Sequence, residues 1–312
     1  MPGAEYEDPA SALALMFGGS HMSTFLGLES RPVADAAPAH VAILGADTAT
    51  PYPAVGPYCA GGADAIRQGS APYAGIQSHW NFDLGRPALP EGAVVDCGNL
   101  PMAEHGAANR AALSGAVRAL RAQGVVPVIL GGDDSVPIPV LDALGPEPLW
   151  IVQVDAHIDW RDEVEGERMG LSSNMRRASE MDHVEGIIQI GQRGLGSARK
   201  ADVAAARDWG VHFFPARGLE EADPLAPLPD GARVAVVFDF DALDPGIMPA
   251  LIAPTAGGLS YWQVIDLFDR VAARAEIAGI TMCEFMPSAD RNAQGAILAG
   301  QILTTWLGRL TG

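Results

Sequence analysis

Two short runs of the sequence place polar side chains at alternate positions around the end of an apolar stretch. The first, LWIVQVDAHIDWRD from Leu149, carries Asp155, His157 and Asp159 at every second residue. The second, VAVVFDFDALDP from Val234, carries Asp239 and Asp241 two residues apart. Because alternate side chains of an extended chain point the same way, each run can direct its polar groups toward one point.

The chemistry that these residues favour is the binding of cations. Buried ionised carboxylates are very costly unless they are ion-paired or bound to metal, and Lys200 is the only lysine of the chain. Carboxylates with one imidazole suit Mn²⁺-like ions. The sequence therefore predicts a divalent-metal site with the ligands Asp155, His157, Asp159, Asp239 and Asp241. A single Asp after a strand more often caps a turn, which suits Asp244 before Pro245.

Two further motifs could join this site. GGDDS places Asp134 between the apolar run VVPVIL and a helix expected to start near Pro137, although Asp and Ser are also ordinary helix-capping residues. CEFMP places Glu284 at the end of the last apolar run. Opposite a pair of dications, Glu284 could form a bidentate clamp on a planar cation.

The elements that must position these residues are short apolar runs that alternate with helical stretches. Such continuous runs are typical of strands buried on both faces of a parallel sheet. Strands are expected from Val41, Ala93, Val125, Leu149, Gly186, Ala232 and Gly279, and helices from His105, Ser197 and Ser260. This alternation predicts a three-layer α/β/α sandwich, in which ligands gather at the carboxyl ends of the strands.

Composition limits the class of protein. The 312 residues are 48% hydrophobic and 19% charged, which favours a single domain over residues 1–312 with a large core. A formal net charge of −18 argues against nucleic-acid partners and favours small cations. We expect a cytoplasmic protein without a membrane span, because no long apolar stretch and no basic leader occur. Three widely spaced cysteines are expected to be reduced.

In their order along the chain, GGDDS, DAHIDWRD, FDFDALDP, GGLSYWQ and CEFMPSAD resemble the ureohydrolase family of arginases and agmatinases, particularly its agmatinase branch. The similarity runs from about Val41 to the C-terminus. It implies a mostly parallel, eight-stranded sheet and hydrolysis of a guanidino compound to urea and an amine at two Mn²⁺ ions, or Ni²⁺ in some relatives. It also implies a homo-oligomer, a trimer or hexamer, with residues 1–38 as an extension packed on or between subunits.

The resemblance also assigns roles to individual residues. Asp155 and Asp239 would bridge the two metals, Asp159 would complete one site, and His157 and Asp241 the other. Asp159 would in addition orient the attacking hydroxide, and Glu284 would hold the guanidinium nitrogens. The remaining residues expected around the substrate are Asn174, Met169 and Trp160, of which Trp160 equally suits the core.

Two departures from the family pattern bear on the substrate. The family usually has His where this chain has Asp134; a carboxylate can still ligate, so Asp134 is predicted as a sixth ligand. It makes the site more negative, which favours a cationic substrate and raises the pKa of bound water. Met169 stands where agmatinase-like sequences often have His, and it cannot transfer protons. Agmatine, a guanidino acid and a less polar guanidine or biguanide all stay open as substrates.

Two other functions are compatible with these motifs. Asp134 and Met169 would also suit a non-catalytic or weakly active subunit that supports a paralogue in a hetero-oligomer. A single-zinc deacetylase shares this type of fold and an Asp-x-His ligand pair. Asp159 together with Asp239 and Asp241 argues against the deacetylase, because they supply ligands for a second ion.

Overall fold

Eight parallel strands form the central sheet, in the order β4-β1-β5-β10-β9-β6-β7-β8. The computed structural model describes residues 22–312. The strands are β1 (Val41–Gly45), β4 (Val94–Asn99), β5 (Val126–Leu130), β6 (Leu149–Val154), β7 (Val184–Ile190), β8 (His212–Phe214), β9 (Arg233–Asp239) and β10 (Glu276–Cys283). A separate antiparallel hairpin pairs β2 (Trp80–Asn81) with β3 (Arg86–Pro87). The predicted parallel, eight-stranded sheet is confirmed.

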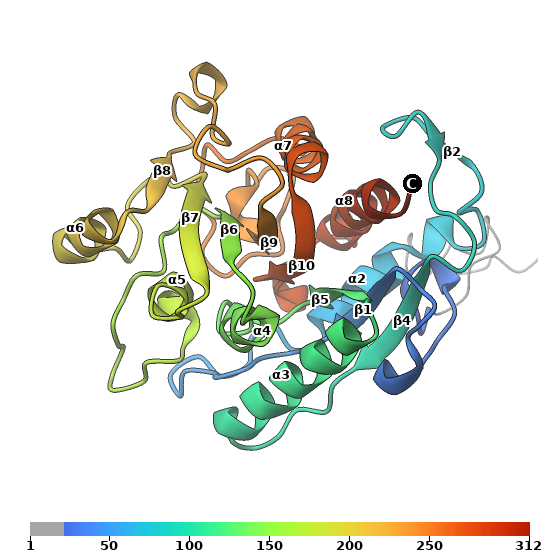
Figure 1. The fold of residues 1–312 in the computed structure, drawn as a ribbon, viewed down its shortest axis with the longest axis horizontal. Helices are drawn as coiled ribbons and strands as arrows, with labels where there is room; N and C mark the ends of the chain where they lie inside the picture. The colour runs from blue at the N-terminus through green and yellow to red at the C-terminus, as the bar shows by residue number, and fades with distance from the viewer. Residues whose placement is uncertain (1–21) are drawn as a thin grey trace, which may run out of the picture.

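Helices cover both faces of the sheet, so the predicted three-layer architecture is also confirmed (Figure 1). One face carries α3 (Gly106–Ala122), α4 (Pro137–Leu144), α5 (Asn174–Ala178) and α6 (Lys200–Trp209). The other carries α2 (Gly62–Gly69), α7 (Tyr261–Arg274) and α8 (Gln294–Thr311). Short 3-10 helices are η1 (Phe25–Gly27), η2 (Val33–Asp35), η3 (Ala71–Tyr73), η4 (Leu171–Ser173), η5 (Leu219–Glu221), η6 (Phe240–Ala242) and η7 (Pro287–Ala289). In residues 22–312 no helix has both the length and the apolar composition to cross a membrane.

A separate apolar core lies on each face of the sheet. On the α7 and α8 side, Trp306 stacks on Phe268 with ring centroids 4.4 Å apart and meets Phe238 of β9 edge-on at 5.2 Å. On the α3 to α6 side, Val117, Leu141 and other aliphatic residues pack against the opposite side chains of the same strands. The continuous apolar strands are therefore explained by burial on both faces.

Several elements differ from the sequence-based expectation, among them α5 and the hairpin strands β2 and β3. The edge strand β8 has only three residues, too few for a clear hydrophobic pattern. Helix α2 and helix α8 were not predicted either; α8 lacks a capping side chain, since its N-cap is Ala293 in the left-handed conformation, and it contains Gly295 and Gly300. By contrast, α7 begins directly after Ser260, where a helix was expected, and Ser260 caps it together with Gln263.

Part of the predicted N-terminal extension packs on its own domain. Phe25 and Leu26 are fully buried, and their backbone N–H groups donate to Asp96 and Ser70, both at 2.8 Å. Residues 1–21 lie outside the described residues, and packing of the extension between subunits stays a prediction.

A buried ion pair fixes α2 against β4. Arg67 is fully buried and donates through Nε and one terminal nitrogen to the two carboxylate oxygens of Asp96, at 2.8 and 2.9 Å. Asp64, in contrast, is exposed and contacts the same guanidinium at 3.1 Å. Since α2 follows the loop 46–61, this pair also fixes the end of that loop.

We expect Asp96→Ala to lower the free energy of unfolding by about 3–5 kcal/mol, because it leaves the Arg67 guanidinium buried without its partner. Asp64→Ala is the matched control, with an expected loss of less than about 1 kcal/mol at an exposed pair. Urea unfolding followed by circular dichroism measures both. Equal losses in the two variants would contradict the assignment of Asp96 as the structural partner.

Candidate metal centre

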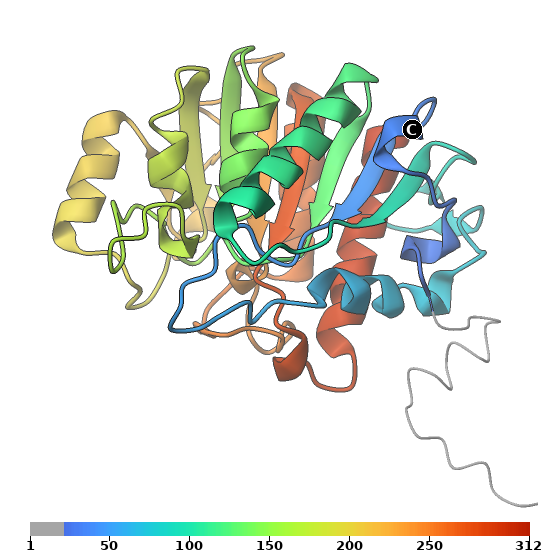
Figure 2. The same ribbon diagram turned by 90° about the horizontal axis from the view of Figure 1, so that it is seen from below.

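Four neighbouring strands of the sheet, β5, β10, β9 and β6, end side by side. Phe238 near the end of β9 pairs with Val154 of β6 and with Met282 of β10, and Met282 pairs with Leu130 of β5. The residues that follow this row lead into the four predicted motifs, and the connecting loops gather at this edge (Figure 2). The register of the sheet therefore brings together groups that are up to 150 residues apart in the sequence.

The predicted ligands form two overlapping groups. Ligand atoms of Asp155, His157 and Asp241 all lie within 4.8 Å of one another, and so do those of Asp134, Asp155 and Asp239. Asp155 belongs to both groups, as a bridging ligand would. Asp239 belongs to one, so its predicted bridging role stays a prediction.

His157 lies between two carboxylates. Its Nδ1 is 2.9 Å from Asp241 and 3.5 Å from Asp155. These hydrogen bonds raise the pKa of His157 to about 11, and the hydrogen bonds from His157 lower the pKa of Asp155 in spite of its burial. In the metal-free chain, a proton on His157 therefore supplies positive charge beside the two carboxylates. A bound metal ion would take over this role and displace the proton.

Asp134 is 3% exposed, and its Oδ1 atom has no hydrogen-bond partner among the described residues. The turn before it requires glycine: Gly132 has φ +79°, and a Cβ there would lie 2.6 Å from the carbonyl oxygen of Ala46. A buried carboxylate oxygen without a donor is costly. The position of Asp134 in a three-carboxylate group thus fits a metal ligand.

Burial and mutual repulsion dominate the electrostatics of the site. Burial raises the pKa of Asp134, Asp159 and Asp239 well above the ordinary value, and the neighbouring carboxylates raise it further. In Asp241 the same two causes outweigh the hydrogen bond with His157. Oxygen-rich ligand sets with this much unbalanced negative charge suit hard divalent cations.

Asp159 lies beside the ligand groups without belonging to either. Gln153, which sequence reasoning missed, donates through its side-chain amide to Asp155 at 2.6 Å and to Asp159 at 3.0 Å. Gln153 is fully buried in β6, two residues before Asp155, so the alternation that identified the ligands could also have identified this orienting group. Asp159 adopts φ +43°, a left-handed conformation that is rare outside glycine.

Glu284 is attached to the GGDDS turn. Its backbone N–H donates to the carbonyl of Gly132, and its Oε1 accepts the N–H of Asp134, both at 2.9 Å. Burial raises the pKa of Glu284 to about 8, against the lowering effect of a hydrogen bond from Tyr58. Glu284 also has a left-handed backbone, with φ +66°. Tyr58 was not predicted, because nothing near it in the sequence indicates its partner.

The other predicted substrate residues do not all lie at this edge. Trp160 is 2% exposed and packs against Trp209 of α6, which agrees with the core role that the sequence also allowed, and its contact with substrate stays a prediction. Asn174 is fully buried, and its amide has no partner among residues 22–312. Met169 lines a cavity of about 350 Å³ that α3, α4 and α5 also line. Substrate contacts of Asn174 and Met169 stay predictions.

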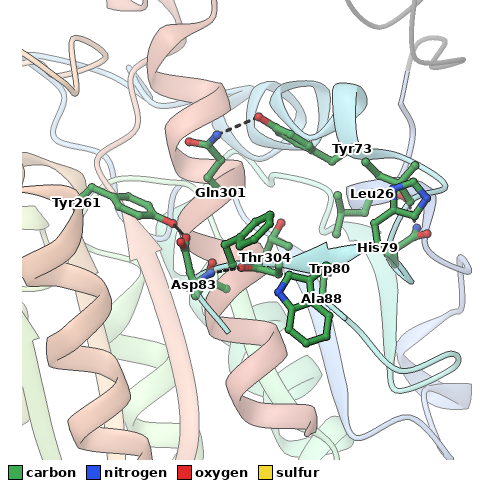
Figure 3. Close-up of a pocket in the computed structure, with 14 residues that line it drawn as sticks. Leu26, Tyr73, His79, Trp80, Asp83, Ala88, Tyr261, Gln301 and Thr304 are labelled. Atoms are coloured by element: carbon green, nitrogen blue, oxygen red, sulfur yellow. Dashed lines mark hydrogen bonds between the residues drawn. The ribbon is translucent and has the colours of Figure 1, made fainter. Parts of the chain in front are cut away.

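A second cavity, of about 400 Å³, lies between the β2–β3 hairpin and α8 (Figure 3). Tyr261 donates to Asp83 and Gln301 donates to Tyr73 at its wall. None of the predicted ligands lines this cavity. It is therefore separate from the metal centre.

Fold and site together define a three-layer α/β protein with a carboxylate-rich centre suited to divalent cations. The sequence model described as "Arginase family" matches residues 39–308. The chain belongs to this family, and the predicted resemblance is confirmed.

Individual relatives agree with this placement. An N(1)-aminopropylagmatine ureohydrolase of Thermus thermophilus is 37% identical over 190 residues, which cover 57% of this chain and 61% of the relative. An agmatinase of Bacillus anthracis is 27% identical over 70% of this chain and 76% of its own length. The chain thus spans about three fifths of the Thermus relative. Proclavaminate amidino hydrolase of Streptomyces clavuligerus shares the fold, with a TM-score of 0.76 at 24% identity over 93% of this chain and 97% of its own.

Protonation of the site predicts an unusual pH dependence. Raised carboxyl and histidine pKa values mean that the folded metal-free chain binds more protons than the unfolded chain between about pH 4 and the pKa of Glu284, about 8. Stability from these groups is therefore present below this window and lost as pH rises through it. The lowered pKa of Asp155 makes stability rise with pH instead, but this is one group, whereas several groups have raised pKa values.

We therefore expect the melting temperature of the metal-free protein to fall between about pH 5.5 and 8, whereas that of the metal-loaded protein does not, because metal binding removes these protons. Differential scanning fluorimetry with and without Mn²⁺ measures this. Parallel pH profiles in the two forms would contradict a metal centre at these carboxylates.

Asp155→Asn should reduce the metal content from about two ions per chain to less than one, because Asp155 is shared by both ligand groups. Asp244→Asn is the control: Asp244 follows the same strand as Asp239 but is bonded to the backbone N–H of Gly246 and Gly257. Elemental analysis after dialysis against Mn²⁺ measures both. Equal metal content in Asp155→Asn and the unmodified chain would place the centre elsewhere.

Proposed function

We propose that this protein hydrolyses a guanidino compound to urea and an amine at a centre of two divalent metal ions. The observation that carries the proposal is the pair of ligand groups sharing Asp155, with Glu284 held beside them at the end of β10. The names of the similar proteins, agmatinase and N(1)-aminopropylagmatine ureohydrolase, support this class of reaction.

The residues that would hold the metals are the two groups already described, Asp155, His157 and Asp241, and Asp134, Asp155 and Asp239. Oxygen donors with one imidazole favour Mn²⁺, with Ni²⁺ as the alternative. When bound, such ions lower the pKa of a water molecule so that hydroxide is available near neutral pH. Asp134 in place of the family's usual histidine adds one negative charge to this environment.

The chain's own residues would position the substrate and move the protons. Glu284 lies within hydrogen-bonding distance of the Asp134 backbone and offers a carboxylate to the guanidinium N–H groups. Asp159 lies next to the ligands and is oriented by Gln153, so its carboxylate can accept a hydrogen bond from the attacking water. The negative charge of the site attracts a cationic substrate.

The substrate class is a guanidino compound whose guanidinium is the reacting end. Agmatine-like amines and guanidino acids are the default substrates, and the amines suit the negative site better. Met169 in place of the usual histidine favours a less polar guanidine or biguanide as the alternative. A similar protein of Pseudomonas aeruginosa, 29% identical over 61% of this chain and 62% of its own length, is named guanidinobutyrase.

We expect the Mn²⁺- or Ni²⁺-loaded protein to release urea from at least one member of a panel of agmatine, N1-aminopropylagmatine, 4-guanidinobutyrate and alkyl guanidines. Glu284→Gln should lower kcat/KM by about 100-fold or more, because a charged hydrogen bond to the substrate is worth about 3 kcal/mol. Colorimetric urea measurement follows both. Absence of urea from every member with both metals would overturn the proposed function.

A further inference from the structure

The Tyr58 hydroxyl lies directly on the carboxylate of Glu284. Its Oη donates to both oxygens, at 2.6 Å to Oε1 and 2.8 Å to Oε2. Oε1 also accepts the N–H of Asp134. Within residues 22–312, Tyr58 is the only side chain that donates a hydrogen bond to Glu284. The Glu284 carboxylate, which is expected to hold the guanidinium, is therefore already hydrogen-bonded to the Tyr58 phenol.

The loop that carries Tyr58 is anchored at several points on the same edge of the sheet. Within this loop, residues 46–61, the N–H of Thr50 donates to Ser135 of the GGDDS turn at 2.7 Å, and the hydroxyl of Thr48 donates to Asp133 of the same turn at 2.9 Å. The Tyr58 side chain is half-buried. Burial, together with the charge of Glu284, raises the pKa of the Tyr58 phenol, so its hydroxyl keeps its proton. The contact is thus a built part of the site.

A guanidinium can approach this pair in two ways. It can displace Tyr58 and form two parallel hydrogen bonds with the Glu284 carboxylate, or it can share the carboxylate with Tyr58. Displacement would remove the acceptor of a partly buried hydroxyl, which is unfavourable. Sharing has no such cost: the phenol oxygen has acceptor capacity left after donating its proton, and Oη lies only 2.8 Å from Oε2.

We propose that Tyr58 is a substrate-binding residue that holds the guanidinium together with Glu284, and this rests on the proposed function. The phenol oxygen and Oε2 each accept one N–H from the planar cation, while the Tyr58 hydroxyl keeps its proton and continues to donate it in a hydrogen bond to the carboxylate. Two acceptors at this spacing match the fork of neighbouring N–H groups on a guanidinium. A primary ammonium, which has no planar fork, gains less from the pair.

Tyr58→Phe should therefore raise KM for agmatine about tenfold, which corresponds to about 1.4 kcal/mol, with kcat within about twofold. The inhibition constant of guanidinium chloride should rise by the same factor, whereas that of 1,4-diaminobutane, the amine product, should change by less than about twofold. Initial rates of urea release by the Mn²⁺-loaded protein give all three constants, and elemental analysis checks that the metal content is unchanged.

Tyr261→Phe is the matched control, because Tyr261 also donates its phenol to a carboxylate, that of Asp83, but at the separate cavity in Figure 3. Its KM and kcat should equal those of the unmodified protein. An unchanged KM in Tyr58→Phe would overturn this inference. A lowered KM would overturn it as well, because it would show that the substrate has to displace Tyr58 from Glu284. An equal rise in the inhibition constants of guanidinium and the diamine would also overturn it, because it would indicate a general distortion of the site. No activity of the unmodified protein toward any guanidine would instead overturn the proposed function, and this inference with it.

Discussion

The repulsion among buried carboxylates is the constraint on which the arrangement of this protein depends. Four adjacent strands end in one row, and their register leaves Asp134, Asp155, Asp239 and Asp241 with ligand atoms only a few ångströms apart. In the interior, like charges at such distances are strongly unfavourable, so protons or cations must compensate them. The rest of the fold, from the two apolar cores to the ion pair of Arg67, holds the strands in place against this repulsion.

The groups next to the ligands adapt to the same constraint. Gln153 donates to two of the carboxylates, and the Asp134 N–H and the Tyr58 hydroxyl donate to Glu284. Each donor stabilises a negative oxygen and also fixes its direction, which a metal or a planar substrate requires. Asp159 and Glu284 both have a left-handed backbone. This unfavourable conformation is tolerated because the hydrogen bonds to their carboxylates hold the two residues in place.

Local patterns in the sequence predict the fold and much of the centre. The apolar runs identify seven of the eight strands, since burial on both faces leaves a continuous hydrophobic signal. Asp155, His157 and Asp241 are found by their spacing around strand ends, where the direction of a side chain follows from its position.

Other features have no such local pattern. Strand β8 is too short to be recognised, and α8 begins without a capping residue. The position of Trp160 next to a ligand does not reveal that its indole packs on Trp209, so the sequence leaves a role in the core and one at the substrate open. Tyr58 has no local signal at all, since its partner is 226 residues away.

The position of β10 has a consequence for biosynthesis. Within residues 22–312 it is the last strand in sequence, yet it lies between β5 and β9 in the interior of the sheet. During translation, β5, β6 and β9 leave the ribosome before the strand that joins β5 to β9, so Asp134 after β5 cannot take its place beside Asp155 and Asp239 until β10 has emerged. The group of Asp155, His157 and Asp241 can form on the paired strands β6 and β9, whereas the group that contains Asp134 forms only after β10 has closed the sheet.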